Sequence, residues 1–306
     1  MDYFFLFLSV LCIAVQFSIS RSYQLRYVRS FADTLFFSLI SGISNVIFFT
    51  VLGLIFYGSL PGFSVFSILM ALALAVISVA ATFVGMMVMK YGDMSIYTMF
   101  MMLGGMILPY FFGIFFLDET LSAARIAGLA LLICALPCSV IKKDGQERSH
   151  VSSAAFSALC GAIFLLNGMN SILTKSHSIS GTAVLPIHFI VYVNLFQAIL
   201  SGVSYGAVQH REKASLVPDR TVPPPASRRL PAVAMSASFA VVSGLGFMFN
   251  IIAAQTVPTV AMYPFITGGT IVFSAASARI VFKEKNSRPA LIGILLSLAG
   301  TLLFLF

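Results

Sequence analysis

Ten long apolar segments occupy almost the whole chain. An α-helix needs roughly 20 apolar residues to cross a bilayer, and each segment comes close to that length. Because 59% of the residues are hydrophobic and only 9% are charged, the composition excludes an ordinary soluble domain. We therefore expect an all-α integral membrane protein with ten transmembrane helices. The predicted spans are residues 3–20, 33–57, 65–89, 94–117, 122–141, 152–174, 182–207, 232–255, 260–282 and 289–306.

The first segment, residues 3–20, has one feature of a signal peptide, because small residues precede Arg21 at its end. However, its start carries Asp2 and no positive charge, unlike a secretory leader. The Ser-x-Leu-Cys sequence at 9–12 also occurs at 157–160, inside a later apolar segment. We therefore interpret residues 3–20 as the first transmembrane helix.

The second half of the chain repeats features of the first. Aligning Glu119 with Glu284 gives an offset of 165 residues, and the same offset places Gly104 on Gly269. Each copy contains an apolar segment with a Gly-Gly pair, an acidic residue after it, and a second apolar segment. In membrane proteins, internal duplication is typical of transporters, whose substrate site lies between the repeats. The predicted boundaries are 1–148 for the first five-segment repeat and 149–306 for the second.

The two halves differ in length at one connection. Asn45 aligns with Asn194 at an offset of 149, which is 16 less than the later offset of 165. The additional residues fall in the basic, proline-rich segment 208–231, whose counterpart in the first half is the short connection 58–64. This composition is typical of a solvated linker.

The basic residues predict the topology. Sixteen of the 18 Lys and Arg residues lie in or beside the odd-numbered connections between segments, whereas only Arg125 and Lys175 lie at even-numbered ones. The positive-inside rule therefore predicts that the odd connections are cytoplasmic and that both termini are outside. This distribution accounts for the net charge of +8 without a nucleic-acid partner.

The acidic residues all lie at segment ends or in connections, so no carboxylate is expected at mid-membrane. This pattern disfavours a proton antiporter with an intramembrane carboxylate, and also an intramembrane hydrolase with an acid pair or a metal. His188 is the one histidine expected to be buried, and Tyr192 follows one turn later, which favours an interhelical hydrogen bond over a proton relay. The cysteines, including Cys134 and Cys138 at i,i+4, are expected to be buried apolar residues, with no metal, cofactor or disulfide framework.

Two glycine pairs lie in the middle of equivalent segments, Gly104-Gly105 and Gly268-Gly269. Glycine costs about 1 kcal/mol relative to alanine inside a helix, so a duplicated pair suggests a use. One use is close packing against a neighbouring helix. The other is a bent helix whose backbone is open to a substrate, which the nearby prolines favour. Both uses are compatible with the sequence.

Two stretches resemble the EamA-type unit of the drug/metabolite transporter superfamily. The first runs from Leu108 to Leu121 and is followed by Gly128. The second combines Tyr263 to Gly269 with Phe282 to Lys285 and Gly293. The shared pattern is a helix with a proline, a short turn with a glutamate and a glycine-bearing helix, once in each half. The resemblance covers nearly the whole chain in segment number and repeat.

This resemblance implies two inverted five-helix repeats and a central cavity lined mainly by helices 1, 3, 4, 6, 8 and 9, with Glu119 and Glu284 as turn residues. The uncharged polar residues on these helices have two possible roles. Each one taken singly would form an interhelical hydrogen bond, whereas together they would line a polar path. The sequence departs from the family pattern in two ways. The family usually has its termini inside, whereas the charge pattern here places them outside. The first helix also carries no carboxylate like that of the small multidrug members. The predicted substrate-pathway residues are Gln16, Tyr97, Gly104, Gly105, Asn167, Asn170, Tyr263, Thr267, Gly268 and Gly269.

The sequence thus predicts a secondary transporter of small metabolites, neutral or zwitterionic and amino-acid-like, that works by alternating access between two repeats. We expect a monomeric, multi-pass protein of the plasma membrane that is not an enzyme and whose partners are its substrate and the lipid bilayer. One alternative is a non-transporting scaffold or sensor with the same fold. Another is a polytopic enzyme that acts on lipids, which would require His, Asp or Arg clustered at one membrane interface.

Overall fold

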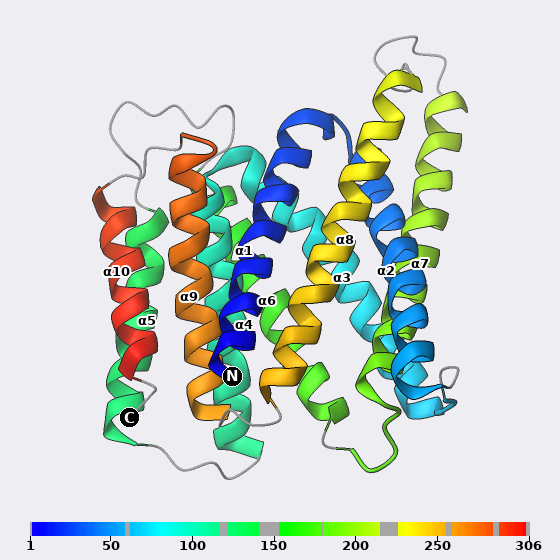
Figure 1. Cartoon of the computed structure of the whole chain (residues 1–306). Helices are drawn as coiled ribbons and strands as arrows, with labels where there is room; N and C mark the ends of the chain where they lie inside the picture. The colour runs from blue at the N-terminus through cyan, green and yellow to red at the C-terminus, as the bar shows by residue number, and fades with distance from the viewer. Residues whose placement is uncertain are drawn as a thin grey trace. The chain divides into compact units, whose positions relative to one another are not determined.

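The computed structural model describes residues 2–58, 62–116, 122–140, 153–178, 180–214, 226–254, 259–283 and 288–303. These residues form ten α-helices and no β-strand (Figure 1), which confirms the predicted all-α class. Each helix coincides with one of the ten apolar segments. The helices are α1 (Asp2–Tyr27), α2 (Phe31–Tyr57), α3 (Val65–Tyr91), α4 (Met94–Phe116), α5 (Ala123–Val140), α6 (Ser153–Ser178), α7 (Pro186–Ala214), α8 (Ala226–Ala254), α9 (Thr259–Ile280) and α10 (Arg288–Leu303).

Seven of these helices contain a stretch long and apolar enough to cross a membrane. The other three, α5, α9 and α10, are also apolar but shorter within the described residues. Helices suit this environment because all their central backbone groups are hydrogen-bonded within the segment, where the bilayer core offers no water. The protein is therefore a multi-pass membrane protein.

Several helices extend past the apolar segments that predicted them, and three of them do so at odd-numbered connections by six residues or more. α1 continues to Tyr27, α7 continues to Ala214, and α8 begins at Ala226, so each includes polar residues of an odd-numbered connection. Hydropathy marks only the apolar part of a helix, whereas Arg, Lys, Gln and Glu are good helix formers in water. The predicted boundaries were therefore too short at this end.

The ends of α2 are fixed by local hydrogen bonds. The Asp33 carboxylate accepts the backbone N–H groups of Arg29 at 2.8 Å and Ser30 at 2.9 Å, which satisfies amides at the start of the helix. At the other end, Gly58 adopts a left-handed conformation with φ of 63° and donates its N–H to the Leu54 carbonyl. The short connection to α3 therefore starts from a defined cap.

The helices form two compact units, and the division between them falls inside α1, α3, α6 and α8. Each unit takes residues from both predicted repeats. The turn residues Glu119 and Glu284, and residues 215–225 of the predicted linker, lie outside the described residues. Unit 1 comprises Met1–Arg21, Val84–Ile172 and Leu245–Phe306, and unit 2 comprises Ser22–Phe83 and Leu173–Gly244.

Three of the helix pairs inside the units share one feature. In unit 1, α10 packs against α5 and α9, and α4 packs against α9. In unit 2, α2 packs against α7 (Figure 1). The pairs α2 with α7, α4 with α9 and α5 with α10 each join helices at the same position of the two predicted repeats. Equivalent helices therefore pack against each other.

Candidate functional site

All ten residues predicted to line a substrate pathway belong to unit 1. They lie on four helices: Gln16 on α1, a group on α4, two asparagines on α6 and a group on α9. The side chain of Tyr263 lies outside the described residues, although its backbone belongs to α9. Unit 1 is therefore the candidate site, and we describe it helix by helix.

α4 approaches α6 closely because of its glycine pair. A Cβ atom on Gly104 would overlap the backbone carbonyl of Phe164, and one on Gly105 would meet the Asn167 amide at 2.5 Å. The Asn167 amide then crosses the interface, because its Nδ2 donates to the Met101 carbonyl of α4 at 2.6 Å. The first glycine pair thus serves close helix packing, and the asparagine is held by that contact.

The glycine pair of α9 faces two other helices. A Cβ on Gly268 would lie 2.6 Å from the Thr301 hydroxyl of α10, and one on Gly269 would lie 3.0 Å from Cγ1 of Val10 on α1. Gly104 therefore lies against α6, and Gly269 lies against α1. In the predicted repeats α4 is equivalent to α9 and α6 to α1, so these two contacts correspond to each other.

A row of buried hydroxyl groups runs along α9. Thr267 is 5% exposed, Thr270 and Ser274 are fully buried, and Ser277 continues the row at the spacing of one helix face. Thr270 Oγ1 has no hydrogen-bond partner among the described residues. The spacing of 267, 270, 274 and 277 was visible in the sequence, but only Thr267 was selected from it.

Two members of this row bond to other helices. Ser274 donates to the Thr98 hydroxyl of α4 at 2.8 Å, and the hydroxyls of Ser277 and Ser18 on α1 lie 2.6 Å apart. We call Ser18, Thr98, Ser274 and Ser277 the hydroxyl cluster. It joins α1, α4 and α9 without any charged group. Sequence reasoning had missed its members on α4 and α9.

Tyr97 is buried beside the hydroxyl cluster residue Thr98. Its ring is edge-on to Phe17 of α1, with ring centroids 5.7 Å apart, and it covers Gly85 of α3, where a Cβ would lie 2.7 Å from the Tyr97 ring. Near the same end of α1, the Arg21 guanidinium donates to the Met89 carbonyl in the last turn of α3. Tyr97 thus packs against both α1 and α3.

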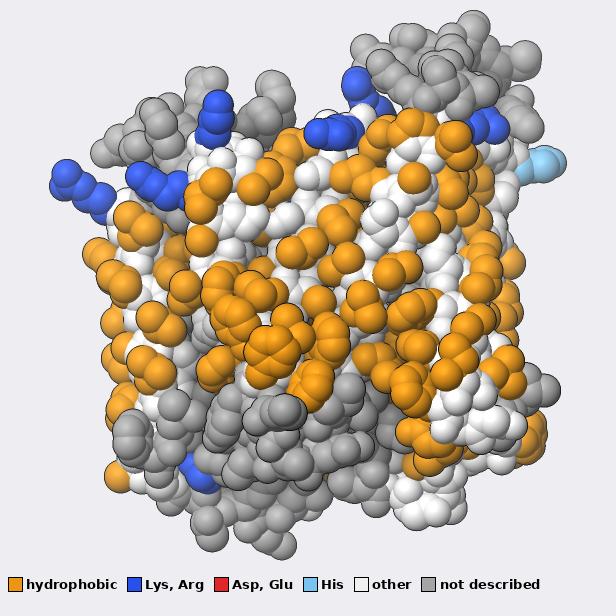
Figure 2. All heavy atoms as spheres, in the orientation of Figure 1, with side chains coloured by type: hydrophobic (Ala, Val, Ile, Leu, Met, Phe, Trp, Pro, Cys, Tyr) orange, Lys and Arg blue, Asp and Glu red, His pale blue; other side chains and the backbone are white. Residues whose placement is uncertain are grey.

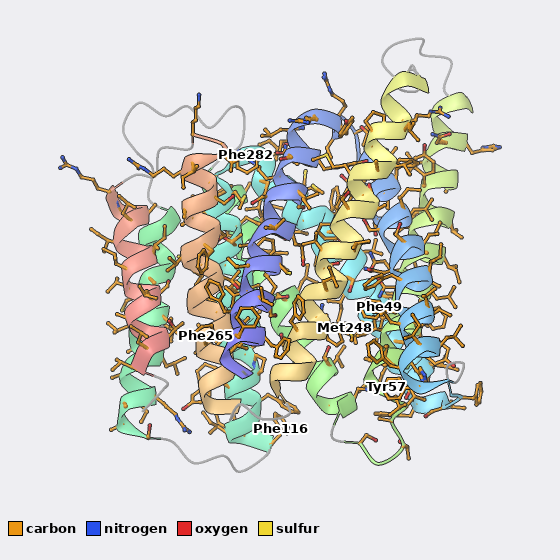
Figure 3. All side chains as sticks on the ribbon, viewed as in Figure 1. Phe49, Tyr57, Phe116, Met248, Phe265 and Phe282 are labelled. Carbon is orange, nitrogen blue, oxygen red and sulfur yellow. The ribbon has the colours of Figure 1, made fainter. Side chains whose placement is uncertain are left out.

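The remaining predicted polar residues of unit 1 are less enclosed. Gln16 is half-buried on α1, and Asn170 is half-buried on α6, one turn after Asn167. Phe265, labelled in Figure 3, lies on α9 within the predicted Tyr263–Gly269 stretch and is 38% exposed. The structure thus brings Gly104, Gly105 and Asn167 together where α4 packs against α6, whereas Tyr97 packs against α1 and α3.

Unit 2 has a different kind of interior. Asn45 of α2 donates to Asn194 of α7 at 3.1 Å, so the two asparagines that align between the repeats bond to each other. Asn194 also donates to the Ile190 carbonyl at 2.9 Å. This bond joins α2 to α7. Further along the same interface, Ser38 of α2 accepts from Gln197 and Ser201 of α7.

Two histidines are buried in unit 2, which corrects the expectation that His188 would be the one buried histidine. His177 is 2% exposed because α6 extends to Ser178, beyond the predicted segment. Its Nε2 lies 2.9 Å from the Ser67 hydroxyl, and its ring stacks on Phe189 with centroids 3.5 Å apart. Burial lowers the pKa of His177 below its ordinary value.

His188 and Tyr192 tie the α2–α3 connection to α7. The Gly62 N–H donates to His188 Nδ1 at 3.4 Å, and the Tyr192 hydroxyl donates to the Gly62 carbonyl at 2.9 Å. Tyr57, labelled on α2 in Figure 3, places its ring 6.2 Å from the His188 ring. These contacts fix one end of unit 2.

The cysteines are less uniform than expected. Cys160 is buried and Cys12 is half-buried, but Cys134 is exposed on α5, which corrects the expectation of a buried side chain. α5 packs chiefly against α10, so its outer face is uncovered within unit 1. Among the residues that the structure describes, no three His, Cys, Asp or Glu side chains are grouped so as to hold a metal.

Comparisons with known proteins add no further identification. No family model matches the chain, and no curated protein matches its sequence.

Proposed function

We propose that this protein is a secondary transporter of small metabolites with an EamA-like, drug/metabolite-transporter architecture of two inverted five-helix repeats and ten membrane spans. The observation that supports this proposal most is the pairing of α2 with α7, α4 with α9 and α5 with α10. When a two-fold axis relates two repeats, each helix close to the axis packs against the equivalent helix of the other repeat. Transporters commonly have such an axis through the substrate site.

The glycine contacts give the proposal independent support. Gly104 lies against α6 and Gly269 lies against α1, which is the exchange that a two-fold relation between the repeats requires. Close approach through small residues is a normal way of packing membrane helices, so either contact alone would carry little weight. The informative feature is that the Gly104 contact and the Gly269 contact occupy equivalent positions in the two predicted repeats.

The chemistry of unit 1 favours a substrate without net charge. Apart from Arg21, which bonds to the Met89 carbonyl, and Arg125 at the start of α5, its described interior groups are neutral, and they include the hydroxyl cluster, the Tyr97 phenol and the Asn167 amide. Such groups can bind hydroxyl, amide, ammonium or carboxylate groups of a substrate without the cost of a buried unpaired charge. We therefore propose a neutral or zwitterionic, amino-acid-like substrate that moves by alternating access of the two repeats in the plasma membrane, with the monomer as the working unit.

The pair Ser67 and His177 raises the alternative of an enzyme, because 2.9 Å is a suitable distance for a nucleophile and its base. However, Ser67 is fully buried, and its oxygen accepts the Val184 N–H at 3.1 Å. A nucleophile must reach its substrate, whereas this hydroxyl is engaged in joining α3 to the start of α7. These contacts support a structural role, so transport remains the preferred function.

Uptake into vesicles tests the proposal. Purified protein reconstituted in lipid vesicles should accumulate at least one member of a panel of labelled neutral and zwitterionic metabolites, with saturation at high concentration. Vesicles without protein and vesicles with heat-inactivated protein are the controls. A sensor would be stabilised against thermal unfolding by a panel member but would not transport it. Absence of uptake across the panel would contradict the proposal.

A further inference from the structure

The interior of unit 1 contains a threonine whose hydroxyl group is unused. Thr270 of α9 is fully buried, and its Oγ1 has no hydrogen-bond partner among the residues that the structure describes. Burying a hydroxyl group without a partner costs free energy, which a ligand could recover by bonding to it. Figure 2 shows that hydrophobic side chains cover much of the outer surface in this view. A polar solute therefore finds better partners among interior groups such as Thr270.

The side chain of Thr270 faces the seam where α1, α4 and α9 meet. Successive residues of a helix are about 100° apart around its axis, so Thr270 lies between the faces of Gly269 and Ser274. Gly269 faces α1, where a Cβ would lie 3.0 Å from Val10 Cγ1, and Ser274 bonds to Thr98 of α4. The Thr270 hydroxyl thus belongs to the same seam as the hydroxyl cluster, one turn of α9 away from Ser274.

The hydrogen bonds in the seam leave acceptors rather than donors for a ligand. A hydroxyl group can donate one hydrogen bond and accept two. Thr98 donates its proton to the Ser95 carbonyl at 3.1 Å, and Ser274 directs its own proton to Thr98 and to the Ile271 carbonyl. Within the described part of the chain, no group donates to the Ser274 oxygen. The oxygens of Ser274 and Thr270 therefore remain available as acceptors, and Thr270 also has a proton without an acceptor.

These available positions match a ligand group that carries several hydrogen-bond donors. An ammonium group has three N–H donors and can bond to both oxygens, whereas a carboxylate could use only the proton of Thr270. In a zwitterion the ammonium group also has its own counter-charge, so the neutral seam need not provide one. The chemistry of the seam thus favours the ammonium end of a zwitterion over its carboxylate end.

We propose that Thr270 and Ser274 bind the ammonium group of a zwitterionic, amino-acid-like substrate. This inference rests on the proposed transport function and adds a binding contact to it. In the structure the seam is closed, because Thr270 is fully buried and Val10 of α1 covers Gly269 beside it. Opening of the contact between α1 and α9 admits the substrate, and the Thr270 hydroxyl then gains the partner that it lacks.

The test measures thermal unfolding of the purified protein in one detergent with added ligands. The probes are glycine, alanine, serine and threonine, together with glycine betaine, a zwitterion whose nitrogen carries no N–H. At least one of the four amino acids should raise the melting temperature of the wild-type protein, because a ligand that binds the folded state stabilises it, and glycine betaine should not. In Thr270→Val, which keeps the shape of the side chain without its hydroxyl, this rise should fall by more than half.

Two control variants separate a binding role from a structural one. Thr270→Ser keeps the hydroxyl and should retain most of the rise. Ser297→Ala removes another fully buried hydroxyl without a partner, on α10 outside the seam, and should retain the whole rise. Without ligand, Thr270→Val should melt at or above the wild-type temperature, because it removes a polar group that has no partner. A structural role for Thr270 would give a lower melting temperature and an unchanged rise.

Four outcomes would overturn the proposal. The first is that no amino acid of the set raises the melting temperature, and the second is an equal rise in Thr270→Val. The third is an equal rise with glycine betaine, which would remove the role of the N–H donors. The fourth is a rise with sodium chloride but not with choline chloride that Thr270→Val abolishes, which would assign the oxygens to a metal ion.

Uptake by reconstituted vesicles distinguishes this proposal from the proposed function. An amino acid that stabilises the wild-type protein but is not taken up would contradict transport and leave the binding site. Uptake that Thr270→Val leaves unchanged would contradict the binding site and leave transport.

Discussion

Units 1 and 2 differ in the balance of contacts that join their helices, although unit 1 also contains the Asn167 amide bond and unit 2 the Ser38–Ser201 hydroxyl pair. Unit 1 relies on glycine contacts, such as Gly104 against Phe164, and on bonds between hydroxyl groups. Unit 2 relies on an amide pair, Asn45 with Asn194, and on a buried imidazole, His177. Amide and imidazole bonds are directional, whereas a hydroxyl can rotate to a new partner. We propose that unit 2 is the more fixed scaffold and that, in the proposed transport cycle, unit 1 contains the contacts that exchange.

The largest expected effect comes from the tightest contact of unit 1. Gly104→Ala should destabilise the protein by about 1–3 kcal/mol, because the added Cβ meets the backbone of Phe164, which cannot rotate away. Gly269→Ala should cost less, because Val10 can adjust its side chain. Thermal unfolding in one detergent measures both.

Gly161→Ala on α6 is the matched control, because nothing lies within 4 Å of the added Cβ. This variant should be neutral or slightly stabilised, since alanine is the better helix former. If Gly269→Ala proves more damaging than Gly104→Ala, the described contact of α4 with α6 does not govern the stability of unit 1.

A smaller effect is expected at the amide pair of unit 2. A double-mutant cycle with Asn45→Ala and Asn194→Ala should give a coupling energy of about 0.6 kcal/mol, the usual value for a bond between membrane helices. The same cycle with Ser18→Ala and Ser277→Ala should give less, if hydroxyl pairs are the more exchangeable contacts. Equal coupling in both cycles would remove the distinction between the units.

His177 should make the stability of unit 2 depend on pH. It lies beyond the membrane-spanning stretch Ala154–Thr174, and burial lowers its pKa from 6.5. The unfolded chain therefore binds a proton more readily than the folded protein, so stability is full above pH 6.5 and falls as the pH drops below it. Melting temperatures measured across this range should show a decline that His177→Gln reduces. His210→Gln, at an exposed position, should retain the wild-type decline.

The smallest effect on stability is expected in the hydroxyl cluster. Ser274→Ala removes one bond to Thr98 and should change the stability by about 0.5 kcal/mol or less. If the cluster exchanges partners during transport, the uptake rate of the same variant should change more than its melting temperature does. A loss of stability comparable to that of Gly104→Ala would show that the cluster is a rigid structural element instead.

The sequence predicted the helices well, because apolar segments in a membrane protein have few alternatives to helix. All ten segments became helices, and errors were confined to ends such as Tyr27 and Ala214, where polar residues continue the helix. His177 was misplaced for that reason. The sequence aligned Asn45 with Asn194, but only the structure shows that the two side chains bond to each other.

The contacts of individual side chains could not be predicted in the same way. Gly104 and Gly269 align in the sequence, but only the structure shows that one lies against a backbone carbonyl and the other against a side chain. The hydroxyls of Ser274 and Ser277 are ordinary in membrane helices, and their partners on α4 and α1 depend on how the helices pack. Exposure of Cys134 likewise follows from which face of α5 is covered.

The most direct test of this account compares uptake by one asparagine variant from each unit. Asn167→Ala removes the amide that joins α6 to α4 in unit 1, and Asn194→Ala removes the amide that joins α7 to α2 in unit 2. Both variants would be reconstituted in vesicles and their initial uptake rates scaled to folded protein. The account predicts that Asn167→Ala loses most of the uptake while Asn194→Ala retains it. Equal rates in the two variants, or a loss confined to Asn194→Ala, would contradict the placement of the pathway in unit 1.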